Sequence, residues 1–135
     1  MFLKFLYSRQ KYSTVQVRID GKIYKALVAD SFIKRAIGLM FRKSIDGDMC
    51  MLFVSNRERR ESLTMQNMLF PIDVLWLDRD LKIVDMAEGL PPDKSLFPFK
   101  TYSPKDKARY VLELKSGSIR KNKINRKSEI KIRNK

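Results

Sequence analysis

The stretch VQVRIDGKIYKALVA, residues 15–29, constrains the fold most strongly, because apolar and polar residues alternate on both sides of Asp20-Gly21. Alternation with a period of two is typical of a half-buried β-strand. An Asp-Gly pair suits a two-residue hairpin turn, since both positions tolerate the positive φ that this turn requires. The pattern therefore predicts an antiparallel hairpin with strands at 14–19 and 22–29.

Further apolar runs of strand length recur along the chain, bounded by turn residues and charged residues. They predict strands at 49–54, 72–77, 82–88, 110–114 and 128–132. The runs at 72–77 and 82–88 flank the short turn DRDL, which predicts a second hairpin.

One segment departs from this pattern. Between residues 30 and 41 the apolar residues recur four positions apart, as they do on one face of a helix. Asp30 or Ser31 can cap the first turn by accepting a hydrogen bond from a free backbone N–H, and Gly38 can end the last. These signals predict one short helix.

Many short strands with one or two short helices predict a mainly β fold, a single compact barrel-like or sandwich-like domain. The charged residues 57–62 and the proline-rich residues 89–104 are predicted to be loops. We expect a basic and apolar N-terminal extension at 1–13, a single mainly β domain at 14–132, and a basic C-terminal tail at 133–135.

The composition excludes several kinds of chemistry. The chain has no histidine and only one cysteine, Cys50. Ser-His and Cys-His dyads, histidine metal ligands and an internal disulfide are therefore excluded, and no metal or other cofactor is predicted. No catalytic constellation is recognisable, which favours a non-enzymatic protein. The apolar start MFLKFL is too short to span a bilayer and lacks a cleavage site, so we expect a cytoplasmic protein without a transmembrane segment.

Four sequence blocks stand out in order along the chain: RAIGLMFR at 35–42, MLF at 51–53, MQNMLFPIDVLWLD at 65–78 and YVLELKSG at 110–117. With their Arg-x-x-Gly-Leu-Met and Met-x-Asn…Pro-x-Asp motifs, they resemble the domain of unknown function 192 family from about residue 15 to 132. Cys50 and Met68 stand where the family usually has Gly and Thr. The resemblance implies a compact, mostly β domain and supplies no reaction.

Four polar residues lie within or beside apolar runs of these blocks: Arg35, Asn67, Asp73 and Glu113. One interpretation is a polar pocket for a small ligand, in which the Arg35 guanidinium holds an anion. The other is an internal salt bridge and a loop clamp. The sequence favours the second, because buried polar groups usually pair with one another. Gln66 is predicted to point to solvent.

The sulfur-containing and acidic residues give weaker signals. Met49 and Met51 share one face of a predicted strand while Cys50 points to the other, so core packing is favoured over a copper site. A buried apolar role is favoured for Cys50, which has no histidine to activate it. The carboxylates of Asp78 and Asp80 belong to a turn. They form no convergent pair with the other acidic residues, so no metal site is predicted.

The net charge of +14 exceeds what solubility requires. Residues 121–135 carry five Lys and two Arg against one Glu. Such an excess suits a polyanion, because each neutralised phosphate releases counterions. Candidate contacts are Lys121, Lys123, Arg126 and Lys127. The alternative is a solvated basic surface. At the other end of the chain, residues 1–13 are expected to dock on the domain or to fray, in preference to anchoring on a membrane surface.

Two functional hypotheses follow. The first is a non-enzymatic binding or accessory domain whose basic ends contact RNA or another polyanion. The second is a small-molecule binding domain for an anionic ligand, or an enzyme, that uses the polar cluster around Arg35.

Overall fold

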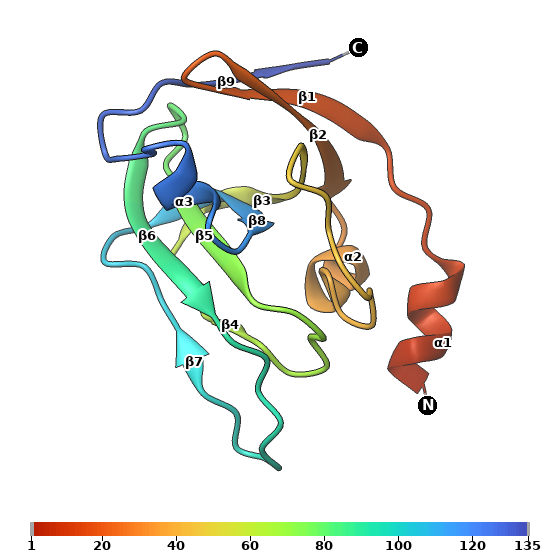
Figure 1. Ribbon diagram of the computed structural model, residues 1–135. Helices are drawn as coiled ribbons and strands as arrows, with labels where there is room; N and C mark the ends of the chain where they lie inside the picture. The colour runs from red at the N-terminus through yellow and green to blue at the C-terminus, as the bar shows by residue number, and fades with distance from the viewer. Residues whose placement is uncertain (1, 135) are drawn as a thin grey trace.

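In the computed structural model, residues 2–134 are described, and they form one curled sheet with short helices at its edges (Figure 1). The elements are α1 (Phe2–Arg9), β1 (Thr14–Ile19), β2 (Lys22–Ala29), α2 (Phe32–Ile37), β3 (Met49–Arg59), β4 (Leu63–Thr64), β5 (Ile72–Leu77), β6 (Ile83–Leu90), β7 (Thr101–Tyr102), β8 (Ala108–Lys115), α3 (Ser118–Lys121) and β9 (Ile130–Arg133). None of the helices within this range is long and apolar enough to cross a membrane.

Seven strands form the main sheet in the order β6-β5-β8-β3-β2-β1-β9. The β2–β3 pair is parallel, and the other neighbours pair antiparallel. Ile83 of β6 and Ile130 of β9 come from opposite edges of the sheet but belong to one buried cluster. The sheet is therefore curled into a half-barrel, which confirms the predicted mainly β fold.

The predicted first hairpin and first internal helix are confirmed. Asp20 and Gly21 have φ of 49° and 88°, the positive values that the tight turn between β1 and β2 requires. The Ser31 side chain accepts a hydrogen bond from the backbone N–H of Lys34 at 3.2 Å and caps α2. Gly38, with φ of 53°, ends that helix.

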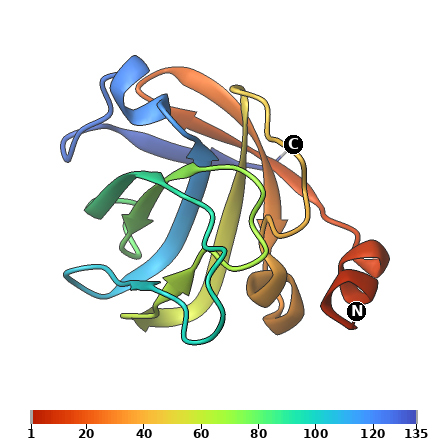
Figure 2. The same cartoon turned by 60° about the horizontal axis from the view of Figure 1, so that its bottom comes forward.

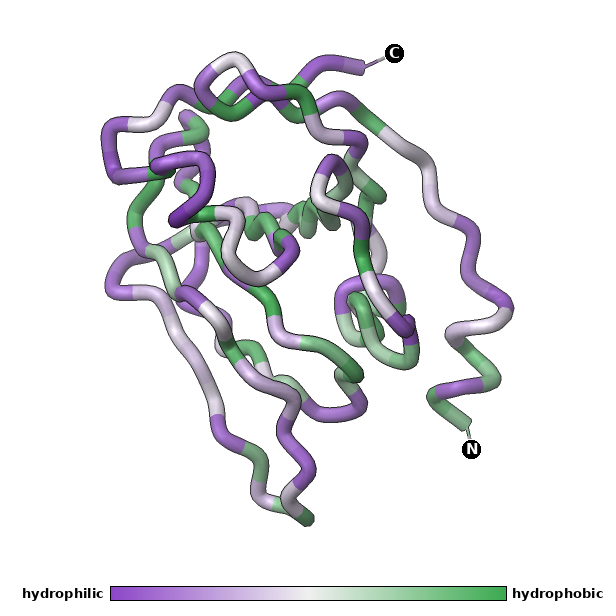
Figure 3. Tube along the Cα trace, viewed as in Figure 1, coloured by the Kyte–Doolittle hydropathy of each residue, from purple (hydrophilic) through white to green (hydrophobic). Residues whose placement is uncertain are grey.

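Apolar side chains form one buried cluster on each face of the sheet. Hydrophobic residues recur along its central strands (Figure 3). On the concave face, Val17, Leu52, Leu75 and Leu112 pack with other residues from five further elements and segments. The opposite face is called the outer face below. There, Met51 and Trp76 pack with residues of β2, of the segment that follows α2 and of the segment that follows β4. Alternate residues of β3, β5 and β8 therefore serve two cores.

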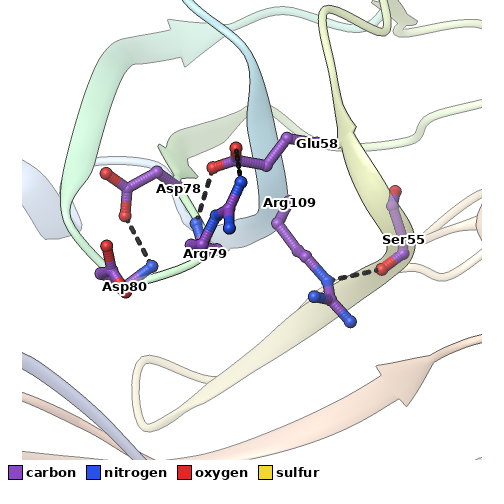
Figure 4. Close-up of polar contacts among 6 residues, drawn as sticks. All are labelled: Ser55, Glu58, Asp78, Arg79, Asp80 and Arg109. Atoms are coloured by element: carbon purple, nitrogen blue, oxygen red, sulfur yellow. Dashed lines mark hydrogen bonds and ion pairs between the residues drawn. The ribbon is translucent and has the colours of Figure 1, made fainter.

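The prediction of a loop at 57–62 is wrong for its first three residues, because β3 continues to Arg59. Its pairing with β8 shifts in register after Val54 and resumes between Arg59 and Ala108. Side chains hold the irregular part in place (Figure 4). Arg109 Nε donates to the Ser55 carbonyl oxygen at 3.0 Å, and the Glu58 carboxylate accepts from the backbone N–H of Arg79 at 2.9 Å.

Four of the shortest or terminal elements were not predicted, namely α1, α3, β4 and β7. α1 forms within the expected N-terminal extension and lies beside α2, with the Tyr7 ring 5.9 Å from the Phe41 ring. α3 has four residues, too few to produce a helical period. The two-residue strands β4 and β7 pair with each other, and β7 lies inside the predicted loop 89–104. The expectation of one or two helices is thus corrected to three in the described residues.

Candidate functional site

Asp73 of β5 is fully buried, and its carboxylate accepts three backbone hydrogen bonds. Oδ1 accepts from the N–H of Gly89 at 2.8 Å, and Oδ2 accepts from those of Gly117 at 3.1 Å and Ile119 at 2.9 Å. Gly117 is the N-cap residue of α3 and has no side chain to cap with, so Asp73 takes that role from another strand. Asp73 therefore clamps the end of β6 and the start of α3 to β5.

Glu113 of β8 lies opposite Met51 of β3 and Val74 of β5. Directly opposed residues project on the same face of a sheet, so the Glu113 carboxyl lies on the outer face, away from Asp73. Glu113 is only 7% exposed, and no residue within 2–134 forms a hydrogen bond or an ion pair with its carboxyl group. Burial raises the pKa of Glu113 to about 8, so the carboxyl is protonated at neutral pH.

A cavity of about 310 Å³ adjoins Glu113 on this outer face. The sheet contributes Phe53, Ser55 and Arg59 of β3, Trp76 of β5, and Val111 and Glu113 of β8, while α2, the turn after it and the segment around β4 supply the remaining lining. Gly38 allows that turn to approach the sheet, because a Cβ at this position would lie 3.1 Å from the Phe53 ring. The volume lies at the lower end of the range for small-molecule sites, about 300–1,000 Å³.

Trp76 brings a second polar group without a partner to this cavity. Its Nε1 atom is buried and forms no hydrogen bond within residues 2–134. Trp76 pairs with Val111, two residues before Glu113 on β8, so Trp76 and Glu113 are diagonal neighbours on the outer face. Buried polar side chains nearly always have partners, so two neighbouring exceptions beside a cavity require an explanation.

Arg35 lines the same cavity from α2 and is half-buried. Its Nη1 donates to the Val54 carbonyl oxygen at 3.0 Å, and no carboxylate of the described residues lies within 4 Å of its guanidinium. The predicted internal salt bridge of Arg35 is therefore wrong. A backbone oxygen is its partner instead, because regular strand pairing breaks after Val54.

Asn67 lies in the turn beside the cavity. Its φ of 58° is the left-handed conformation that Asn tolerates better than most residues, and its carbonyl oxygen accepts from the Phe41 N–H at 3.0 Å. Its Nδ2 lies 3.8 Å from the Met40 sulfur. Asn67 thus joins the segment after α2 to the segment after β4. The prediction that Gln66 points to solvent is wrong, because Gln66 is half-buried, bridges to Asp93 and lines the cavity.

The sulfur atoms divide between the two faces of the sheet. Cys50 is fully buried in the concave core, where burial raises its thiol pKa to about 12. Met51, Met65 and Met68 pack in the outer-face core, and Met65 and Met68 also line the cavity. Within residues 2–134, no three His, Cys, Asp or Glu side chains converge as metal ligands do.

The four basic candidates Lys121, Lys123, Arg126 and Lys127 are all exposed; Lys121 ends α3, and the other three lie in the connection between α3 and β9. This connection is held in place, because the Glu129 N–H donates to the Asp20 carboxylate at 2.8 Å. Arg126 also lies 3.7 Å from the Asp85 carboxylate. The basic side chains therefore project from the end of α3 and from a loop that is held against the β1–β2 turn.

The structure thus brings Arg35 and Glu113 to one cavity, places Asp73 on the opposite face and leaves Asn67 in an adjoining turn. Sequence reasoning missed Trp76 as a site residue. The alternation in IDVLWL already sets Trp76 on the opposite face from Asp73, and that was the available signal.

The profile of the DUF192 family, described as "Uncharacterized ACR", matches residues 15–132. The chain belongs to this family. DUF192 membership confirms the resemblance inferred from the sequence blocks. Curated relatives carry the name UPF0127. A Pyrococcus horikoshii protein is 39% identical over 88 residues, covering 64% of this chain and 68% of that protein. A Thermococcus kodakarensis protein is 33% identical, covering 71% of this chain and 57% of that one.

Two crystal structures share the fold of this DUF192 domain. A Sinorhizobium meliloti 1021 protein, described provisionally as a transcription regulator, has a TM-score of 0.81 at 23% identity, covering 92% of this chain and 97% of that chain. A protein of unknown function from Novosphingobium aromaticivorans has a TM-score of 0.77 at 20% identity, covering 89% and 84%. At these identities the likeness establishes the fold alone.

Proposed function

We propose that this domain binds a small, largely apolar molecule that carries a carboxylate or carbonyl oxygen, and that the cavity on the outer face is its site. One observation carries the proposal: Glu113 and Trp76, diagonal neighbours on the outer face, both line this cavity, and neither polar group has a hydrogen-bond partner within residues 2–134. Leaving such groups unpaired costs folding free energy, so a ligand that pairs with them gains affinity.

The polar groups define the ligand's head. Below pH 8 the Glu113 carboxyl carries its proton and can donate a hydrogen bond, as can Trp76 Nε1–H. Arg35 and Arg59 add positive charge to the wall of the cavity and Glu61 adds one negative charge, so the wall keeps a net positive charge. Two donors and a net positive charge suit an oxygen acceptor, which keeps the anionic ligand of the second hypothesis and assigns Glu113 a donor role.

The remaining lining defines the ligand's body. Phe53, Val111, Leu39 and Met65 are apolar and offer dispersion contacts without hydrogen-bonding groups. Methionine side chains adapt to irregular shapes, which suits a flexible aliphatic or a flat aromatic body. A medium-chain fatty acid is a simple probe with these properties.

Trp76 is the only tryptophan of the chain, so its fluorescence reports directly on the cavity. We expect octanoate to change that fluorescence saturably and to bind more tightly than 1-octanol or octylamine, which share its chain and differ in their head groups. The Glu113→Met variant, which has no hydrogen-bond donor at this position, should bind octanoate at least about tenfold more weakly, a loss of about 1.4 kcal/mol. Glu113→Gln keeps an N–H donor and does not titrate, so its affinity should not fall above pH 8, where Glu113 ionises in the wild type.

The Glu88→Gln variant is the matched control, because Glu88 is exposed and lies outside the cavity lining. It should bind octanoate as the wild type does. Failure of all three probes to change Trp76 fluorescence at about 1 mM would contradict the proposal for this ligand class. Preference for octylamine would also contradict it, by showing that the site holds a cation at an ionised Glu113.

The ordered basic loop favours a second candidate function, contact with RNA or another polyanion. Its four cationic side chains are exposed, and of these only Arg126 lies near a carboxylate of the described chain. We expect single-stranded RNA to bind in fluorescence anisotropy with a steep dependence of log K on log salt. Replacing Lys121, Lys123 and Lys127 with Gln should reduce both affinity and slope without changing the melting temperature.

Replacing Lys25, Lys43 and Lys82, which are exposed and lie outside both basic ends, provides a control with the same change in charge. Equal losses from the two triple variants would show that binding follows net charge and would contradict a role for the loop.

A further inference from the structure

Exposed apolar side chains gather at one end of the molecule. Eight large hydrophobic residues are highly exposed in the described chain, and Leu96, Phe97 and Phe32 are 89%, 86% and 79% exposed. Seven of the eight come from four segments, namely α1, α2, the residues 68–71 before β5 and the loop 91–100 between β6 and β7: Phe2, Phe5, Phe32, Ile33, Leu69, Leu96 and Phe97. Isolated exposed hydrophobic residues are common, but a gathering of this kind marks an interaction surface.

The four segments lie on the same side of the molecule. In Figure 1 the loop 91–100 forms the lowest point and α1 lies at the lower right, with α2 beside α1 and the segment before β5 between the loop and α2. The hydropathy colouring shows hydrophobic residues on α1 and at the tip of the loop (Figure 3). The eighth residue, Ile23, is the second residue of β2 and lies beside the β1–β2 turn, away from this end.

The same segments are strongly cationic. They contain six Lys or Arg residues and a single acidic residue, Asp93. The Asp93 carboxylate is already paired within its loop, where it accepts hydrogen bonds from Ser95 and from the Lys100 N–H at 2.9 Å. The surface therefore combines protruding apolar side chains with positive charge that its own carboxylate leaves unmatched.

We propose that this end docks on the surface of an anionic lipid bilayer. Apolar side chains enter the boundary between head groups and acyl chains, while Lys and Arg attract anionic lipids. The tip of the loop 91–100 reaches furthest, and Leu96 and Phe97 are its membrane contacts. The proposal is independent of the ligand proposed above.

Other partners fit these observations less well. Self-association through a two-fold axis would set the cations of this end against the same cations of a second copy. Nucleic acid would contact the Lys and Arg residues, and its bases could stack on the Phe rings. It offers no apolar environment that would bury the exposed aliphatic side chains of Leu96, Leu69 and Ile33. A bilayer accommodates both the aliphatic side chains and the positive charge.

The test is co-sedimentation with vesicles of phosphatidylcholine alone and of phosphatidylcholine with roughly 30 mol% phosphatidylserine, at about 0.1 M salt. We expect at least about tenfold stronger binding to the anionic vesicles. The double variant Leu96→Ser/Phe97→Ser should lose at least about tenfold of that binding. It should keep the wild-type melting temperature, because both side chains are almost fully exposed.

Ile23→Ser is the matched control, since Ile23 is an exposed hydrophobic residue outside this end, and it should bind vesicles as the wild type does. Absence of binding to the anionic vesicles, or full binding by the double variant, would overturn the proposal. It would also be overturned if the double variant lost RNA binding while keeping vesicle binding. Abolition of a lipid-independent dimer, without loss of vesicle binding, would equally overturn it.

Discussion

The Asp73→Ala variant is expected to unfold with a free energy about 3–5 kcal/mol lower than that of the wild type, because three backbone N–H groups lose their acceptor. Each unsatisfied buried donor costs about 1–3 kcal/mol, and the two partly buried ones can recover some of this from water. Domains have total stabilities of about 5–15 kcal/mol, so the loss is a large share. Urea denaturation followed by Trp76 fluorescence measures it.

Two further variants and a local readout make this test specific. Asp73→Asn keeps the shape and one acceptor oxygen, so its loss should be smaller. Asp106→Ala removes an exposed carboxylate and should change stability by less than about 0.5 kcal/mol. In Asp73→Ala, the amides of Gly117 and Ile119 should exchange with solvent faster than those of β1. Wild-type stability in Asp73→Ala would contradict the clamp.

The Glu113→Gln variant is expected to become progressively more stable than the wild type as pH rises from about 4.5 to about 8. Burial raises the folded-state pKa of Glu113 from 4.5 to about 8, so in this window the unfolded chain ionises while the folded chain keeps the proton. Folding must then take up a proton, and wild-type stability falls with rising pH. The shift corresponds to about 5 kcal/mol over the whole window, while Gln does not titrate.

The measurement is urea denaturation of both proteins at several pH values across this window. The informative quantity is the change with pH of the difference in unfolding free energy, because a constant cost of burying the Gln amide cancels from it. The Glu88→Gln variant, changed at an exposed position, should give a curve parallel to that of the wild type. A parallel curve from Glu113→Gln would contradict a buried carboxyl without a partner.

Local patterns in the sequence account for most of the sheet. The alternation around Asp20-Gly21 predicts β1 and β2 correctly, since a two-residue turn fixes which residues oppose each other. The charged residues 57–59 predict a loop but belong to β3. A hydrogen bond between the Glu58 carboxylate and the Arg79 N–H, 21 residues away in the chain, keeps this part of the strand in place. β4 and β7 have two residues each, and pairing across the fold defines them rather than periodicity.

The candidate site could be predicted only in part. Glu113 stands out as a charge within an apolar strand, and Asp73 does so for the same reason. Asp73 is fully hydrogen-bonded whereas Glu113 lines a cavity, and this difference depends on the face of the sheet that each occupies and on the segments that cover that face. Trp76 becomes a neighbour of Glu113 through the register between β5 and β8, which joins residues more than 30 positions apart. No single stretch of sequence carries that information.

Asp73 and Glu113 project from adjacent strands to opposite faces of the sheet, and this arrangement has a consequence for protein engineering. The clamp and the concave core lie behind the sheet, so side chains that line the cavity can be randomised without altering them. Directed evolution at Phe53 and Val111, which are only partly buried, should therefore yield folded variants with new ligand selectivity. With its single tryptophan at the cavity, each such variant would be a fluorescent biosensor that needs no added dye.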